Sequence, residues 1–163
     1  MNLLAIDFKQ GFVGGCTTVT ELEQRRALIT AWGNKIEQLD DASKIEFQVT
    51  HRFADNVYIR EMLIPQDSFI IGKIHTTQFF NILVSGQCLL ATTDGVIHIR
   101  APYTFISEPG SQKCAIALTD VLWQTVHVTD EKDPAKIADS LTVDSYEELT
   151  TDFAMDQLLG EHI

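Results

Sequence analysis

Three histidines are the residues of this sequence best suited to hold a metal ion or carry a proton at neutral pH. His75 lies in GKIH, His127 lies in VLWQTVHV, and His51 begins HRFADNVY, just before a run typical of a strand. A neutral imidazole is a common metal ligand, and its unperturbed pKa lies near neutrality. If His51 or His127 lies beside His75, a two-histidine metal site would result. The alternative is that each histidine is hydrogen-bonded in place or exposed.

An arginine and a tyrosine share one face of a second run. Tyr58 and Arg60 alternate with Val57, Ile59 and Glu61 in VYIREMLI, so they lie on the same side of a strand as Met62. An arginine inside a barrel would favour an anionic ligand, because its guanidinium makes paired hydrogen bonds to carboxylates and phosphates. The alternative is that Arg60 reaches solvent or pairs with one of the many acidic residues.

Motifs of common catalytic centres do not occur in the sequence. It contains no G-x-S-x-G, G-x-G-x-x-G, P-loop or H-E-x-x-H pattern. Three widely spaced cysteines show no CxxC spacing and are expected to be buried thiols: Cys16, Cys88 and Cys114. We therefore assign no catalytic residue.

Short β-rich runs fill the centre of the chain. Six of them predict strands, over residues 57–64, 79–84, 87–93, 96–100, 114–118 and 121–128. A strand spacing of about 8–12 residues with tight turns indicates an antiparallel sandwich or barrel rather than βαβ units. The pair Asp94-Gly95 favours a tight hairpin, because both central residues of a type I′ turn need positive φ.

A helix is predicted before the strands. Thr20 and Glu23 fit a capping box, and the apolar stripe that follows ends near Gly33. This helix, with Trp32 on it, is expected to pack on the barrel or on a second subunit. The domain boundaries that we expect are an N-terminal arm and helix over 1–44, a barrel over 45–130 and accessory helices over 131–163.

Helix signals return after the last strand. Asp133-Pro134 supplies a cap and a proline at the first helical position of AKIADSL. Ser145 and Glu148 repeat the capping-box pattern before LTTDFAMDQLL. Both segments are expected to form short helices on the outside of the barrel.

The segment GKIHTTQFFNILVSG resembles the first conserved motif of the cupin superfamily, which has two histidines, a glutamate and a glycine. Counted back from Gly86, the three ligand positions of that motif fall on Lys73, His75 and Phe79. The resemblance implies a mainly β protein with a double-stranded β-helix, the jelly-roll barrel of the cupins.

The segment APYTFISEPGSQK resembles the second cupin motif, whose histidine position falls on Lys113. Phenylalanine has no donor atom, and a lysine ammonium has no lone pair. Catalytic metal sites need about three protein ligands. We therefore expect no cofactor, or at most a weakly bound divalent metal at His75, with His51 or His127 as a second ligand. Lys73 and Lys113 would instead add positive charge to a pocket.

A narrower resemblance is to small cupin-like proteins of unknown function encoded by tailed bacteriophages. It rests on HRFADNVYIREMLIP, GKIH, APYTFISEPGSQK and DVLWQTVHVTDEKDP, over about residues 45–140. In those proteins a glutamate and a histidine follow GKIH, where this sequence has Gln78 and Phe79. The resemblance implies a viral protein in the host cytoplasm or in the virion. The pocket candidates from all these patterns are Tyr58, Arg60, Lys73, His75, Gln78, Lys113 and His127.

Charge restricts the partners. Lys and Arg number 12 against 23 Asp and Glu, which gives a formal net charge of -11. Such a surface repels phosphate backbones, so we expect no nucleic-acid binding. No stretch is apolar enough for a signal peptide or a membrane span, so a soluble cytoplasmic protein is expected.

Two function classes fit these patterns. The first is a non-catalytic module that binds a small polar or anionic ligand, or that contacts a virion or host protein. The second is a metal-dependent cupin enzyme, an isomerase or dioxygenase, built around His75. A homodimer is expected in either case, because a partner would cover the exposed edge strands of the barrel.

Overall fold

The computed structural model describes residues 18–40, 44–92 and 95–149. Its strands are β1 (Gln48–Ala54), β2 (Val57–Ile64), β3 (Phe69–Ile71), β4 (Ile74–His75), β5 (Phe79–Ser85), β6 (Gln87–Thr92), β7 (Gly95–Arg100), β8 (Tyr103–Ser107), β9 (Cys114–Ala117), β10 (Val121–Val128) and β11 (Thr142–Val143). Its helices are α1 (Val19–Glu37), α2 (Pro134–Leu141) and the 3-10 turn η3 (Tyr146–Glu148).

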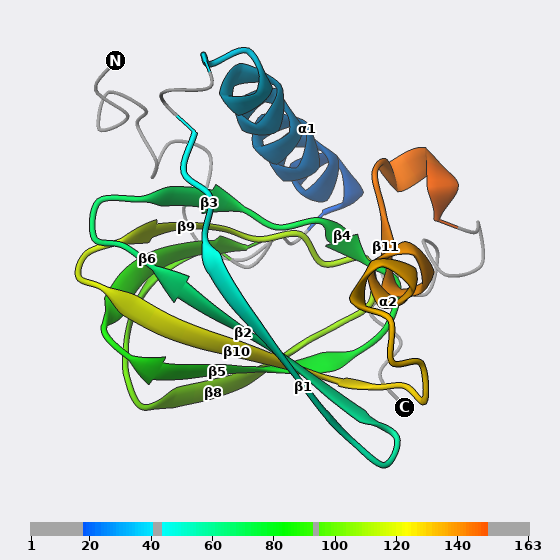
Figure 1. Ribbon diagram of the computed structural model, residues 1–163. Helices are drawn as coiled ribbons and strands as arrows, with labels where there is room; N and C mark the ends of the chain where they lie inside the picture. Colours follow the sequence, from blue (N-terminus) through cyan, green and yellow to red (C-terminus); the bar gives the residue numbers. More distant parts are fainter. Residues whose placement is uncertain (1–17, 41–43, 93–94, 150–163) are drawn as a thin grey trace.

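Two antiparallel sheets form the barrel (Figure 1). One has the strand order β1-β2-β10-β5-β8 and the other β3-β9-β6-β7, while β11 and β4 form a separate pair. The chain crosses between the two sheets at β2–β3, from β3 past β4 to β5, and at β5–β6, β7–β8, β8–β9 and β9–β10. This alternation is the topology of a jelly roll, with β1 added at one edge. The predicted double-stranded β-helix is confirmed.

The six predicted strands all form, with bounds that differ by no more than two residues. The predicted hairpin also forms, since β6 pairs with β7 up to Thr92 and Gly95, although Asp94 lies outside the described residues. The sequence did not reveal β1, and His51 lies inside that strand, opposite Arg60, rather than before a strand. Most side chains of β1 are exposed. An edge strand of this kind lacks the apolar alternation that marks a half-buried one.

Gly86 makes the turn between β5 and β6 possible. Its φ is 88°, a region that residues with a side chain rarely adopt, and a Cβ there would collide with the carbonyl oxygen of Asp120. The turn therefore requires a glycine at this position of the cupin-like motif.

Helix α1 begins two residues before its predicted start. Its N-cap is Thr18, whose hydroxyl accepts a hydrogen bond from the backbone N–H of Glu21, and the Glu21 side chain accepts one in return. The prediction that Thr20 is the N-cap is wrong, because TVTELE contains two overlapping Thr-x-x-Glu patterns and the first one caps the helix. The helix also continues through Gly33 to Glu37.

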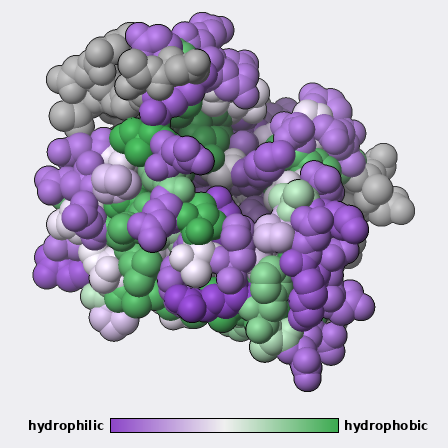
Figure 2. All heavy atoms as spheres, in the orientation of Figure 1, coloured by the Kyte–Doolittle hydropathy of each residue, from purple (hydrophilic) through white to green (hydrophobic). Residues whose placement is uncertain are grey.

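The buried face of α1 packs on its own barrel. Ile29 and Trp32 form one hydrophobic cluster with Ala91 and Cys114, and the Trp32 ring meets the edge of Phe69 with the ring centroids 6.0 Å apart. Of the two alternatives for this helix, packing on the barrel is therefore the one observed. Figure 2 shows hydrophobic atoms exposed below α1, on the side of the barrel that faces the viewer.

The C-terminal signals are largely confirmed. Asp133 caps α2 by accepting a hydrogen bond from the Ala135 N–H, and Pro134 occupies the first turn. Ser145 and Glu148 form the expected capping box, but around a single 3-10 turn. The helix predicted after it lies outside the described residues, as does Cys16. Among the described helices, none is long and apolar enough to cross a membrane.

The interior of the barrel differs between its two ends. At the end beside Gly86, apolar side chains fill the space, among them Ile64, Leu83, Cys88 and Val121. At the other end, α2 packs Ile137 and Leu141 against Tyr58. Between these two apolar ends a cavity remains, and polar side chains such as Arg60, Asn81 and His127 lie among the apolar ones that line it.

Candidate functional site

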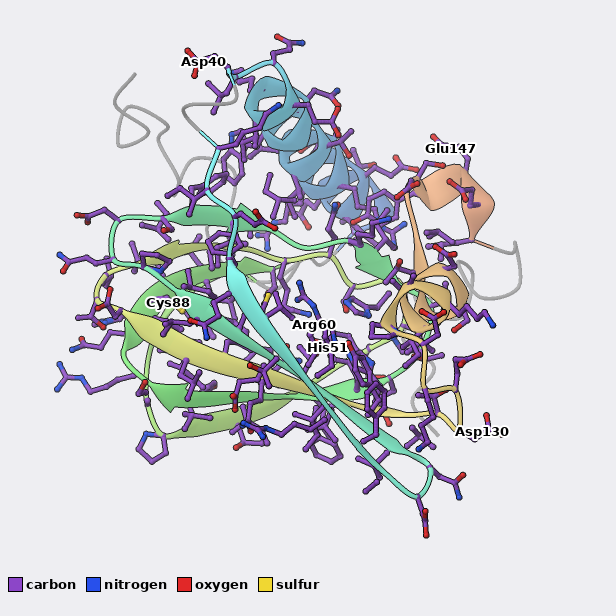
Figure 3. All side chains as sticks on the ribbon, in the orientation of Figure 1. Asp40, His51, Arg60, Cys88, Asp130 and Glu147 are labelled. Carbon is purple, nitrogen blue, oxygen red and sulfur yellow. The ribbon has the colours of Figure 1, made fainter. Side chains whose placement is uncertain are left out.

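The cavity has a volume of about 390 Å³ and lies between the two sheets. Strand β2 contributes Tyr58 and Arg60, and β10 contributes Thr125 and His127, because alternate residues of a strand face inward. The predicted common face of Tyr58, Arg60 and Met62 is confirmed, since all three line the cavity. Figure 3 shows Arg60 inside the barrel, with His51 close to it.

Three aromatic rings form one wall. The Phe79 ring centroid lies 4.0 Å from that of His75 and 4.7 Å from that of His127. The two histidine rings are stacked 5.4 Å apart at an interplanar angle of 13°. His75 and Phe79, which occupy two of the cupin-like ligand positions, thus lie beside His127.

Both wall histidines are neutral at neutral pH. Burial, followed by the positive charge of Lys113, lowers the pKa of His75 to about 3 and the pKa of His127 to about 4. The Nδ1 atom of each ring is buried and has no hydrogen-bond partner among the described residues. These two nitrogens are therefore buried polar atoms without a partner among the described residues.

Lys113 extends its amine over the same wall. Its Nζ lies 4.4 Å from the centroid of the Phe79 ring and donates a hydrogen bond to Ser107 Oγ at 2.8 Å. Burial lowers the pKa of Lys113 to about 7. Burial therefore favours the amine form of this lysine more than exposure to solvent would.

A chain of hydrogen bonds fixes the polar floor. Asn81 Nδ2 donates to Ser107 Oγ at 2.9 Å, and Trp123 Nε1 donates to Asn81 Oδ1 at 3.3 Å. This chain of hydrogen bonds was not predicted from the sequence. Asn81 alternates with Phe79 and Leu83 in FFNILV, so its place on the inward face of the strand could have been predicted.

Arg60 is half-buried and faces the cavity without an acidic partner. No carboxylate among the described residues pairs with it, and its Nη1 contacts the sulfur of Met62. Burial lowers the pKa of Arg60 below its usual value, but a guanidinium stays charged in proteins. On the outer face of the same sheet, Arg52 pairs with Glu61 at 3.1 Å, so ion pairing occurs outside the barrel rather than inside.

Two sequence candidates do not reach the centre of the cavity. Lys73 lies at the rim with 59% of its side chain exposed, and its Nζ bonds Asp144 at 2.9 Å. Gln78 is exposed, bonds both carboxylate oxygens of Glu108 at 3.0 Å and is not part of the lining. Gln78 lies in the turn before β5, which leaves the barrel wall.

The residues present do not fit a transition-metal centre. His75 and His127 are two imidazoles side by side, whereas a catalytic metal site needs about three protein ligands. His51 Nδ1 is engaged in a 2.7 Å hydrogen bond with Tyr58 OH. Within residues 18–40, 44–92 and 95–149, no three His, Cys, Asp or Glu side chains are grouped to hold a metal.

Comparison with known proteins gives similarity of structure only. No protein-family model and no curated protein matches the sequence. Among solved structures, a cupin superfamily protein from Desulfitobacterium hafniense is similar at 9% identity and a TM-score of 0.46, over 56% of this chain and 84% of that chain. An RmlC-like cupin with a double-stranded β-helix from Methanocaldococcus jannaschii is similar at 12% identity and a TM-score of 0.44, over 61% of this chain and 92% of that chain.

A third similar structure, a predicted oxalate decarboxylase from Thermotoga maritima, has 14% identity and a TM-score of 0.45, over 53% of this chain and 84% of that chain. Several solved structures similar to this chain are thus cupins. The assignment of the jelly roll itself rests on the strand order.

Proposed function

We propose that this protein binds a small organic anion in the barrel cavity, and that it does so without a metal. The observation that carries the proposal is the charge of the lining: Arg60 and Lys113 face the cavity, and no Asp or Glu among the described residues lines it. The chain as a whole has a net charge of -11. Carboxylates are therefore plentiful on this protein, yet the described lining contains none.

The energetic reason is that a cation taken out of water without a partner destabilises the fold. A bound carboxylate would supply the missing partner and would be held by the paired hydrogen bonds of the Arg60 guanidinium. Binding of an anionic ligand would then explain why Arg60 and Lys113 line the same cavity.

The rest of the cavity suggests the shape of that ligand. Tyr58, His75, Phe79 and His127 offer ring faces, while the Asn81 amide offers hydrogen bonds. The volume of about 390 Å³ falls in the range of about 300–1,000 Å³ that small-molecule sites occupy. A compact, planar or unsaturated carboxylate matches these surroundings.

The test is a thermal-shift and calorimetric comparison of matched ligands. Benzoate and pyruvate are expected to raise the melting temperature, whereas benzamide and acetone, which lack the charge, are expected to raise it less. Arg60→Gln should remove the response to the acids, and the surface variant Arg52→Gln should keep it. Equal responses of acids and uncharged analogues, or a full response in Arg60→Gln, would contradict the proposal.

The biological setting is a separate part of the proposal. Support for a bacteriophage origin, and for a role in the host cytoplasm or as a virion component that contacts a host protein, comes from the sequence resemblance alone. Detection of the chain by mass spectrometry in purified particles would establish the virion role, and detection only in lysates of infected cells would exclude it. No observation on the described residues favours the metal-dependent isomerase or dioxygenase.

A further inference from the structure

We propose that the ligand is an oxo acid and that Lys113 forms a Schiff base with its carbonyl carbon. This inference rests on the proposed anion site and names the chemical class of its ligand. It assigns to Lys113 a covalent role that the positive charge alone does not require.

The first support is the surroundings of the amine. Lys113 Nζ lies over the Phe79 ring, inside a cavity where no described residue contributes a carboxylate to keep it protonated. Lys73 contrasts with it, since that amine pairs with Asp144 at the surface. Burial brings the pKa of Lys113 to about 7, so the nucleophilic amine form is present at neutral pH. An amine that is desolvated in an apolar pocket is a known condition for an imine-forming lysine.

The second support is the way the amine is held. Ser107 Oγ accepts a hydrogen bond from Asn81 Nδ2, and Asn81 is itself fixed by the Trp123 N–H. The Ser107 hydroxyl therefore has its own proton available for the Nζ lone pair, or an acceptor available for the N–H of Lys113 at 2.8 Å. Ser107 is a positioning residue for either protonation state.

The third support is the pairing of two functions across the cavity. Arg60 would hold the carboxylate of the ligand, which leaves the adjacent carbonyl group to face the lysine. His75 and His127 flank Phe79, the ring beneath Nζ, so the amine lies beside two neutral imidazoles rather than beside charged groups.

The reaction needs no oxidant and no cofactor. The Nζ lone pair forms a bond to the carbonyl carbon, and the π electrons of the carbonyl pass to its oxygen. A first proton transfer from nitrogen to this oxygen gives a carbinolamine, and a second places both amine hydrogens on the oxygen. One water molecule leaves, the C=N bond forms, and hydrolysis reverses the sequence.

Reductive trapping tests this inference on the intact protein. With pyruvate and sodium cyanoborohydride, the hydride adds to the imine carbon, and the protein should gain the mass of the acid less one oxygen atom. Peptide mapping should place this adduct on Lys113 in preference to the exposed Lys136. Lys113→Arg should lose the adduct, while Lys136→Arg should keep it. Propionate, which has no carbonyl group, should give none.

The outcomes separate the two proposals. If pyruvate stabilises the protein through Arg60 but leaves Lys113 unmodified, the Schiff-base inference is overturned and the anion site stands. If pyruvate neither stabilises nor modifies the protein, both fall. An adduct spread evenly over the lysines also overturns the inference. If Lys113→Arg does not fold, the peptide map of the unaltered protein still decides.

Discussion

The cavity residues of this barrel carry charge states set by burial rather than by residue type. His75 and His127 are held neutral, and Lys113 is held near the midpoint of its titration. The resemblance to the two cupin motifs assigned their ligand positions to Lys73, His75, Phe79 and Lys113, and the last three of these lie together in the cavity wall while Lys73 lies at the rim. It could not predict their protonation, since burial follows from the packing of strands far apart in the chain.

The buried histidines predict a loss of stability in mild acid. Their folded-state pKa values, about 3 and about 4, lie below the unfolded value of 6.5. Between those limits the unfolded chain binds more protons, so their contribution to stability is complete above pH 6.5 and declines as the pH falls toward 4. Replacing His75 with Gln should flatten the melting-temperature profile over this window. The variant of the exposed His98, His98→Gln, should follow the unaltered protein. Parallel profiles for all three would contradict the assignment.

Arg60 predicts a conflict between stability and binding. Arg60→Met removes an unpaired, half-buried cation and should raise the stability of the ligand-free protein by roughly 1 kcal/mol. The same variant should lose the response to benzoate. Chemical denaturation with and without the acid measures both effects. A loss of stability without ligand would indicate that Arg60 has a structural role instead.

Among the secondary-structure elements, the strands were predicted best from turn residues and from the alternation of side chains between the two faces of a strand. The runs 57–64 and 121–128 became β2 and β10 with those bounds, because both alternate and both lie in the middle of a sheet. The short strands β3, β4 and β11 left no such signal, since pairs and triplets of residues have no period to read. The start of α1 was placed two residues late, because two capping patterns overlap and only packing chooses between them.

Two glycines give a matched test of the elements they occupy. Gly86→Ala should destabilise the barrel by roughly 2–4 kcal/mol, because the new Cβ meets the Asp120 carbonyl oxygen at a φ of 88°. Gly33→Ala, within α1, meets no atom closer than Ile71 Cδ1 at 4.0 Å, so better helix propensity should stabilise it by about 0.5–1 kcal/mol. Urea denaturation of both variants provides the measurement, and a mild effect at Gly86 would mean that the turn can rearrange.

The molecule as a whole leaves an apolar surface on the outside of its larger sheet. Phe80 and Ile106 are paired across β5 and β8 and are 50% and 49% exposed. Strand β8 is also an edge of that sheet. Because copies of a chain with a net charge of -11 repel one another, association requires an uncharged surface such as this one.

We therefore expect a homodimer in which the β8 edges of two copies meet about a twofold axis. Light scattering at micromolar concentration should give about twice the chain mass of 18.3 kDa. Phe80→Lys should convert the dimer to a monomer, and Ile97→Lys, an exposed apolar residue on β7, should not. A monomeric mass for the unaltered protein would exclude this arrangement.

The two cations without counter-ions inside the barrel have a practical consequence for anyone who purifies the protein. A positively charged cavity would bind an anionic metabolite of the expression host, and citrate or phosphate in the buffer would compete for the same site. Purification in a chloride buffer, followed by denaturation and mass spectrometry of the released small molecules, would identify the bound ligand without a screen of candidate compounds.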